Sequence, residues 1–191
     1  VYMGEIPAIS PSGTFIINGV ERVVVNQLTR SEGVFFVPVE DPLATSILAG
    51  AKILPKNGVW LEFETSRSGF ISVKIDKKRK LAGTTILRIF GLDSDEKIRE
   101  AFADSYKGGS SFGSYIDRTL EKDASKSYNE AVLEVYKRIR PGDPLILENA
   151  KQVVENTFFN SRRYNLGKSG RFKLDQKLHD EKSSNSSPVL E

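Results

Sequence analysis

The stretch Val59-Trp60-Leu61-Glu62-Phe63-Glu64-Thr65-Ser66-Arg67-Ser68-Gly69-Phe70-Ile71-Ser72-Val73-Lys74-Ile75 contains two runs of strand-forming residues with a polar turn between them. Every second residue of each run is apolar, which is the period of a strand with one buried face. These apolar residues are Val59, Leu61, Phe63, Ile71, Val73 and Ile75. The pattern predicts an antiparallel pair of strands, 59–64 and 70–75, joined by residues 65–69.

Upstream of this pair, the first third of the chain also has β character. Two β-branched runs within residues 14–25 flank the dipeptide Asn18-Gly19. Asn-Gly favours a type I′ turn, in which both central residues have a positive φ, so the sequence predicts a β-hairpin here.

Downstream, the patterns are helical. Asp93 and Glu96 have the spacing of an N-cap and its N3 partner, and Ser127 and Glu130 repeat it. Apolar residues then recur at helical intervals from residue 128 to 139, where Pro141-Gly142 ends the run, and again from 147 to 158. Residues 108–111 are interpreted as a loop. We therefore expect an α+β fold with a strand-rich N-terminal part that contains hairpins, followed by short packed helices.

Composition excludes several kinds of site. The chain has 191 residues, a net charge of +3, no cysteine and one histidine, His179, close to the polar C-terminal stretch. A Ser-His-Asp or Cys-His centre and the usual zinc site are therefore not expected, and we assign no catalytic residue and no metal ligand. We also expect no membrane segment. The first residue is Val1 rather than an initiator Met, which suggests a piece of a longer protein.

Two short motifs have bland interpretations. Gly167-Lys168-Ser169 resembles the end of a phosphate-binding loop, but Arg162 stands where that loop needs a glycine, so we interpret the motif as a turn. Asp93-Ser94-Asp95 could supply a carboxylate pair to magnesium, but a helix N-cap accounts for it more simply.

Trp60 stands out because strand periodicity places it opposite Leu61 and Phe63, on the polar face with Glu62 and Glu64. Leaving so large an aromatic ring on a polar face forgoes its burial energy unless another group covers it. Either a neighbouring loop covers the ring, or the ring is a surface on which a nucleic-acid base stacks, which is worth about 1–3 kcal/mol per base. The sequence alone leaves both open.

Basic residues provide a second candidate feature. Lys77, Lys78, Arg79 and Lys80 form an uninterrupted cationic run. The run is either a solvated loop or a contact for a phosphate backbone, whose released counterions favour binding. Arg30 follows a β-rich run and is expected at a strand end, where it either binds phosphate or a guanine edge or pairs with Glu32.

Several ordered motifs resemble the bacterial RNA polymerase β-subunit family. The longest is Gly13-Thr14-Phe15-Ile16-Ile17-Asn18-Gly19-x-Glu21-Arg22-Val23-Val24-Val25-x-Gln27-Leu28-x-Arg30-Ser31-x-Gly33. Four more follow in the family's order, namely Gly58-x-Trp60-Leu61-Glu62-Phe63, Ile75-Asp76-Lys77-Lys78-Arg79-Lys80-Leu81, Tyr136-x-x-x-Arg140-Pro141-Gly142-x-Pro144 and Arg163-Tyr164-x-Leu166-x-x-x-Gly170-Arg171-x-Lys173. The chain departs from the family with Glu32 in place of Pro and Ala82-Gly83 in place of Pro-Ala.

The resemblance implies roles for particular residues. Trp60 would stack on a non-template base, Arg30 would help to form the adjacent base pocket, and residues 77–80 would line the DNA channel. Arg22, Val25 and Gln27 would border the RNA path and the rifamycin pocket. Residues 1–31 would be a hairpin segment at the junction of protrusion and lobe, residues 32–178 the lobe, and residues 179–191 a flexible tail.

The resemblance also implies partners. The chain would be a non-catalytic portion of DNA-directed RNA polymerase, a nucleotidyltransferase. It would work with the β′, α and ω subunits, a sigma factor, regulators that dock on the lobe, DNA and nascent RNA. It would hold no cofactor itself, because the magnesium would be bound by β′. The location would be the nucleoid-associated cytoplasm or a plastid. The alternative is a stand-alone single-stranded nucleic-acid-binding or adaptor module.

Overall fold

The computed structural model describes residues 1–39, 48–106 and 112–178, which form two compact units. The expected loop at residues 108–111 and the expected flexible tail at residues 179–191 lie outside the described residues. The first unit comprises residues 1–30 and the second begins at Ser31.

The first unit contains the predicted hairpin. Strand β1 (Phe15–Ile17) pairs antiparallel with β2 (Val20–Arg22). Asn18 has φ 52° and Gly19 has φ 76°, so both central residues are left-handed, as a type I′ turn requires. The strands are shorter than the β-branched runs, and Arg30 lies in an irregular segment instead of at a strand end.

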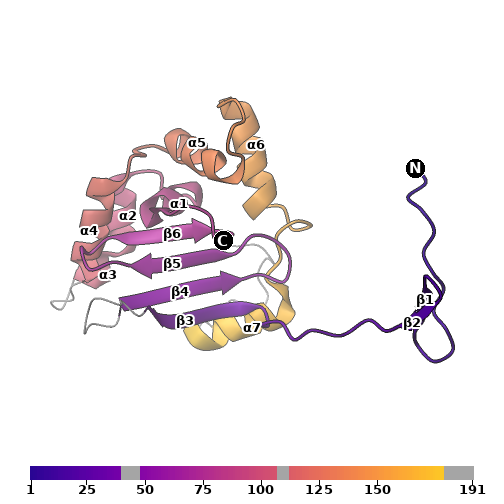
Figure 1. Cartoon of the computed structure of the whole chain (residues 1–191). Coiled ribbons are helices and arrows are strands. Elements are labelled where there is room, and N and C mark those ends of the chain that lie inside the picture. The colour runs from indigo at the N-terminus through magenta and orange to yellow at the C-terminus, as the bar shows by residue number, and fades with distance from the viewer. Residues whose placement is uncertain (40–47, 107–111, 179–191) are drawn as a thin grey trace. The chain divides into compact units, whose positions relative to one another are not determined.

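The second unit is built on a five-stranded antiparallel sheet (Figure 1). Its order follows the chain: β3 (Gly33–Val39), β4 (Leu48–Leu54), β5 (Leu61–Thr65), β6 (Ile71–Ile75) and β7 (Leu81–Ala82). The central pair β5–β6 confirms the predicted strand pair, with Phe63 opposite Val73. The first strand of the pair begins at Leu61, so Val59 and Trp60 precede it.

Helices follow the sheet, which confirms the α+β class. They are α1 (Gly83–Ile89), α2 (Asp95–Ala101), α3 (Ala103–Tyr106), α4 (Phe112–Lys122), α5 (Tyr128–Ile139), α6 (Leu147–Phe158) and α7 (Gly167–Leu178). Helices α1, α5 and α6 gather on one side of the sheet, whereas α7 lies against β3 (Figure 1). None of the helices in the described part of the chain is both long and apolar enough to cross a membrane.

The core lies between the sheet and these helices. The sheet contributes residues from β5 and β6, and α1, α5 and α6 contribute the rest. The most deeply buried are Leu61, Val73, Ile75, Ile86, Ala131, Val132, Val135, Ala150, Val154 and Phe158. Because the inward residues of β5 and β6 alternate with outward ones, the opposite face of the sheet carries the polar side chains.

The helix boundaries mostly agree with the sequence patterns. Ser127 caps α5 as predicted, because its side chain accepts a hydrogen bond from the Glu130 N–H. The Asp93 prediction is wrong by one residue, since Ser94 caps α2 and Asp93 instead pairs with Lys97 at 2.7 Å. The turn interpretation of Gly167-Lys168-Ser169 is also wrong, because these residues are the first turn of α7.

Candidate nucleic-acid interface

Trp60 sits at the end of the sheet where β5 begins. Its neighbour Leu61 is 1% exposed and points into the core, so the alternating geometry of an extended chain directs the indole to the opposite face. Trp60 is 38% exposed. The Trp60 side chain is thus neither buried in the core nor fully exposed to solvent, and part of its surface is accessible to a ligand.

The turn after β6 lies beside the indole. Asp76 has φ 47° and Lys77 has φ 60°, and the Lys78 N–H donates to the Ile75 carbonyl at 2.9 Å, which closes a tight turn. The turn places Lys77 Nζ 5.0 Å from the centroid of the Trp60 ring, within the range of a cation–π interaction. The expected covering loop and the expected cationic run are therefore one structural feature.

The other cations of the run have different surroundings. Lys78 Nζ donates to the Ile139 carbonyl at 2.9 Å, near the C-terminus of α5. Lys80 Nζ lies 2.8 Å from a Glu64 carboxylate oxygen. Arg79 is exposed and makes no ion pair with any described residue. Arg79 is therefore the member of the run that is most available to an external anion.

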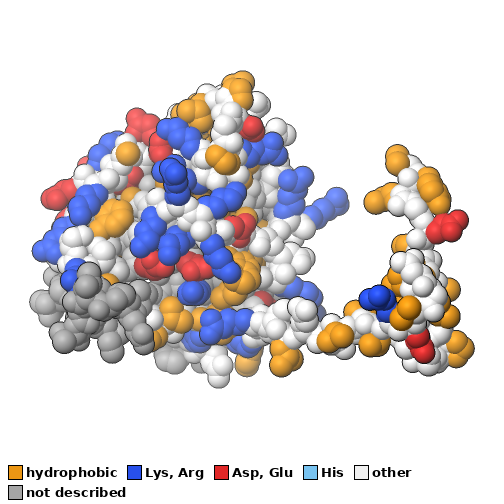
Figure 2. Space-filling view, in the orientation of Figure 1, with side chains coloured by type: hydrophobic (Ala, Val, Ile, Leu, Met, Phe, Trp, Pro, Cys, Tyr) orange, Lys and Arg blue, Asp and Glu red, His pale blue; other side chains and the backbone are white. Residues whose placement is uncertain are grey.

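The outward face of the sheet next to this turn carries alternating charges. Lys52 lies 3.2 Å from Glu62, and Lys74 lies 2.6 Å from Glu64, in pairs that run across neighbouring strands. Lysine and arginine side chains are interspersed with acidic ones over the face turned to the viewer (Figure 2). We call Lys52, Glu62, Glu64, Lys74 and Lys80 the charged lattice.

The lattice favours the ionised form of Glu64. Burial alone would raise the pKa of Glu64, but hydrogen bonds from Lys74 and Lys80 more than offset this effect and lower the pKa below its ordinary value. Glu62 is only 6% exposed. Carboxylates of the chain therefore partly neutralise the lysines of the lattice.

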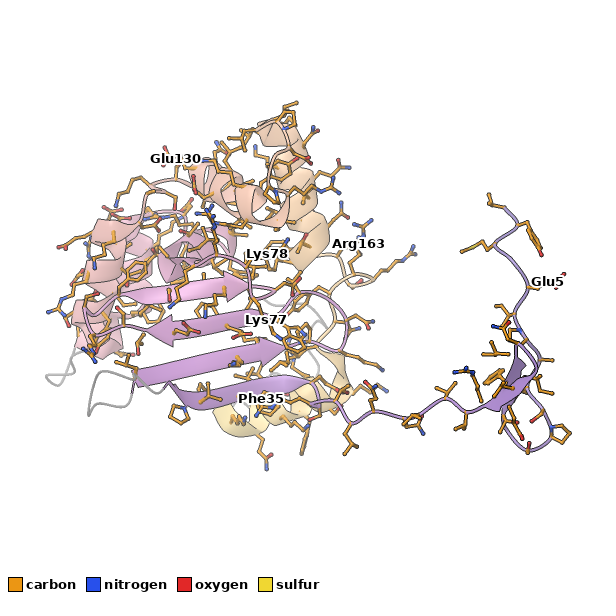
Figure 3. The ribbon with its side chains drawn as sticks, in the orientation of Figure 1. Glu5, Phe35, Lys77, Lys78, Glu130 and Arg163 are labelled. Atoms are coloured by element: carbon orange, nitrogen blue, oxygen red, sulfur yellow. The ribbon has the colours of Figure 1, made fainter. Side chains whose placement is uncertain are left out.

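A segment distant in sequence reaches the same end of the sheet. Asn57 and Asn165 exchange two backbone hydrogen bonds, of 3.1 and 2.9 Å. Gly58 has φ 114°, and a Cβ there would lie 2.7 Å from the Tyr164 ring, so only glycine allows this approach. The bridge brings the exposed Arg163 to the end of the sheet that carries Lys77 and Lys78 (Figure 3).

The remaining expected site residues belong to the first unit. Arg22 ends β2, whereas Val25, Gln27 and Arg30 follow it without regular structure, and all four are exposed. Glu32, the expected alternative partner of Arg30, accepts a hydrogen bond from the Ser169 hydroxyl, which lowers the pKa of its carboxyl. The structure thus brings together Trp60 and residues 77–80 within the second unit.

Two features of this surface were not inferred from the sequence. One is the hydrogen bond from the backbone N–H of Trp60 to Asp76 Oδ1 at 2.8 Å, and the other is the Asn57–Asn165 bridge. The residue type at position 76 could have indicated the turn that makes the first possible, because aspartate tolerates a left-handed backbone. As for metals, the described ranges contain no group of three or more His, Cys, Asp or Glu side chains placed to hold an ion.

Comparisons with known proteins found matches over most of the chain. The family model for RNA polymerase Rpb2, domain 2, matches residues 30–190. The DNA-directed RNA polymerase subunit beta of Alkaliphilus oremlandii is 43% identical over 178 residues, which is 93% of this chain and 14% of that protein. The corresponding subunit of Rubrobacter xylanophilus is 44% identical over 178 residues, covering 93% of this chain and 15% of that protein.

A third relative extends the match. The subunit of Chloroflexus aggregans is 40% identical over 208 residues, covering 98% of this chain and 17% of that protein. The chain thus spans 14–17% of the length of these curated relatives. Because the family model and these relatives cover nearly the whole chain, the chain belongs to the RNA polymerase Rpb2 domain 2 family and is of the kind found in bacterial β subunits.

Proposed function

We propose that this chain is the DNA-channel lobe of the β subunit of a DNA-directed RNA polymerase, where it holds downstream DNA and the non-template strand during transcription. The observation that carries the proposal is the half-exposed Trp60 ring beside the cationic turn of residues 77–80. In this role the chain contributes to a nucleotidyltransferase without supplying its catalytic residues.

The geometry suits an unpaired base next to a phosphate backbone. An aromatic ring with one open side stacks on any base, and the adjacent cations neutralise phosphates. Arg79 faces solvent and Lys77 lies against the indole, so a nucleotide stacked on Trp60 would have its phosphate within reach of both. The charged lattice continues this surface along the sheet.

The proposal extends to the first unit and to the partners. Arg30 would help to form the neighbouring base pocket, and Arg22, Val25 and Gln27 would border the RNA path and the rifamycin pocket. Residues 1–31 would form the junction with the protrusion and residues 32–178 the lobe. The β′, α and ω subunits, a sigma factor and lobe-binding regulators would be the protein partners. Magnesium would be bound by the β′ subunit. The protein would be located in the nucleoid-associated cytoplasm or in a plastid.

The test is Trp60→Ala in the assembled polymerase that contains this chain. Losing one stacked base should weaken binding to promoter DNA with a melted non-template strand by about 1–3 kcal/mol. Binding to fully double-stranded downstream DNA should change much less, because the bases are then paired. Competition binding with the two DNA substrates measures both effects.

Tyr128→Ala is the matched control. Tyr128 is also 38% exposed, but it lies at the start of α5, away from the cationic turn. It should leave both affinities unchanged. Equal effects of the two variants, or a Trp60→Ala variant that loses several kcal/mol of folding stability, would contradict the proposal.

A further inference from the structure

The backbone N–H of Trp60 donates a hydrogen bond to the side chain of Asp76, where a β-ladder normally has a backbone carbonyl as the acceptor. Leu61 pairs with Ile75, so Trp60 and Asp76 are the next pair of the β5–β6 ladder. The Asp76 N–H donates to the Trp60 carbonyl at 2.9 Å, as the ladder requires. In a regular antiparallel pair of this kind the two residues exchange both backbone bonds. Here the backbone N–H of Trp60 donates instead to Oδ1 of the Asp76 carboxylate, at 2.8 Å.

The backbone at Asp76 explains this substitution. Its φ of 47° begins the left-handed turn, which ends the extended conformation that a ladder carbonyl needs. Position 76 therefore needs a residue that tolerates left-handed backbone and also has a short side-chain acceptor. Only aspartate and asparagine meet both requirements well.

The same residue also determines where Lys77 lies. Lys77 follows Asp76 in the turn with φ 60°, and its Nζ sits 5.0 Å from the centroid of the Trp60 ring. One residue thus supplies both the carboxylate that anchors the backbone of Trp60 and the first left-handed position of the turn that carries the cation. Free rotation of either would separate the ring from the charge.

We propose that Asp76 is a positioning residue, which holds Trp60 and Lys77 together as a preformed site for one nucleotide, with the base on the open side of the indole and the phosphate at Lys77. This inference rests on the proposed function for the nucleotide and on the geometry of the free chain for the positioning.

Charge makes the inference testable by the sign of an effect. Asp76 is an exposed anion beside a site for a polyanion. If it acted only through its charge, every neutralising substitution would tighten binding of DNA. If it acts by positioning, removal of the acceptor weakens binding in spite of the lost negative charge.

Three substitutions separate the two requirements at position 76. Asp76→Asn keeps the acceptor and the tolerance of left-handed backbone. Asp76→Gly keeps only the tolerance, and Asp76→Ala keeps neither. Asp93→Ala, in the segment before α2, removes the same charge away from the turn and is the control.

The first measurement needs no nucleic acid. Trp60 is the only tryptophan of the chain, so indole fluorescence reports on this site alone. Acrylamide quenching and fluorescence anisotropy of the 191-residue chain should be unchanged by Asp76→Asn and Asp93→Ala. Asp76→Gly and Asp76→Ala should increase quenching and lower anisotropy as the indole becomes mobile.

The second measurement titrates the chain, and the assembled polymerase that contains it, with a short single-stranded oligonucleotide. We expect Asp76→Asn to bind within about twofold of wild type, or more tightly because of its lost negative charge. Asp76→Gly and Asp76→Ala should bind about three- to tenfold more weakly, which is a part of the loss of one stacked base. In a Trp60→Ala background, Asp76→Ala should have almost no further effect.

The outcomes distinguish the two hypotheses. If neither preparation of the wild type binds the oligonucleotide, the proposed function fails whatever the quenching shows, and the nucleotide site fails with it. If the wild type binds but Asp76→Ala leaves quenching unchanged, or tightens binding, the positioning role is wrong and the proposed function stands. A loss that persists in the Trp60→Ala background means that Asp76 acts on general folding, which also overturns the inference.

Discussion

Two cationic regions of the second unit show how surroundings decide what a charge does. Arg88 in α1 is 0% exposed and is enclosed by acceptors. Its guanidinium pairs with Asp95, lies 3.7 Å from Asp123 and donates to the Asp93 carbonyl at 3.2 Å. In the turn at residues 77–80, Arg79 is exposed and has no such carboxylate among the described residues.

The buried region serves the fold. Asp123 is 4% exposed and accepts hydrogen bonds from the Thr84 and Thr85 hydroxyls at 2.5 and 3.0 Å and from the Ser125 N–H at 2.9 Å. These bonds join α1 to the segment between α4 and α5. Because Arg88 is 0% exposed, its charge is not accessible to a ligand. The exposed turn is the reverse case at Arg79, whose guanidinium is open to solvent.

The largest expected effect comes from breaking the buried region. Arg88→Met should lower the free energy of unfolding by about 3–5 kcal/mol, because it leaves the buried Asp123 carboxylate without its cation. Urea unfolding followed by circular dichroism measures the change. The double variant Arg88→Met/Asp123→Asn should recover part of the loss, because no buried charge then remains.

The exposed Lys97–Asp93 pair, at 2.7 Å, is the control for that prediction. Lys97→Met should cost less than about 0.5 kcal/mol, the usual worth of such a pair on a helix surface. Similar losses for Arg88→Met and Lys97→Met would remove the distinction between the two kinds of cation.

The exposed region should instead be sensitive to salt. Neutralising one DNA phosphate contributes about −0.9 to the slope of log K against log salt. Arg79→Ala should therefore flatten the slope by nearly one unit in the assembled polymerase. Lys80→Ala should flatten it less, because Lys80 is already paired with Glu64 at 2.8 Å.

The variant with alanine at all four positions, 77 to 80, should lose about one to two units of slope, fewer than its four removed charges allow. Lys97→Ala is the matched control for Lys80→Ala, since the two lysines have the same side-chain exposure of 56% and each is ion-paired. It should leave the salt slope unchanged, because Lys97 lies outside the turn. An unchanged slope in the quadruple variant would mean that residues 77–80 are a solvated loop and do not contact DNA.

The sequence predicted those elements whose signals are local. Asn18-Gly19 is enough to form its turn, and Ser127 with Pro141-Gly142 is enough to bound α5, because each acts through its own backbone geometry or a neighbour a few residues away. Helix α7 was missed because Gly167 and Gly170 are poor helix formers and lie in its first turn. The packing of α7 against β3 compensates for that poor propensity.

The candidate site was only partly predictable for a related reason. Strand periodicity placed Trp60 on the polar face, and composition located the cationic run. The contacts between them depend on the register of β5 and β6 and on the left-handed turn at Asp76, which no single segment specifies. The pairing of Lys80 with Glu64 likewise joins residues that are adjacent only after the strands are aligned.

The smallest expected effect tests the boundary between the two kinds of charge. Glu64 forms ion pairs with Lys74 and Lys80, so the charges of these two lysines are partly neutralised within the chain. Glu64→Gln should lower the free energy of unfolding at pH 7 by only about 0.5 kcal/mol, because the pairs are partly exposed. It should also free both lysines, and the salt slope of DNA binding should become steeper.

Acid provides the control for this last prediction. The hydrogen bonds from Lys74 and Lys80 hold the pKa of Glu64 below its unfolded value of 4.5. A carboxylate with a lowered pKa stabilises the fold above the unfolded pKa, and this contribution is lost as the pH falls through the folded pKa. The stability difference between wild type and Glu64→Gln should therefore be constant above about pH 5 and shrink below pH 4.5. A difference that persists under acid would show that Glu64 stabilises the sheet through packing rather than charge, and a salt slope that does not steepen would show that Lys74 and Lys80 are not held back from DNA.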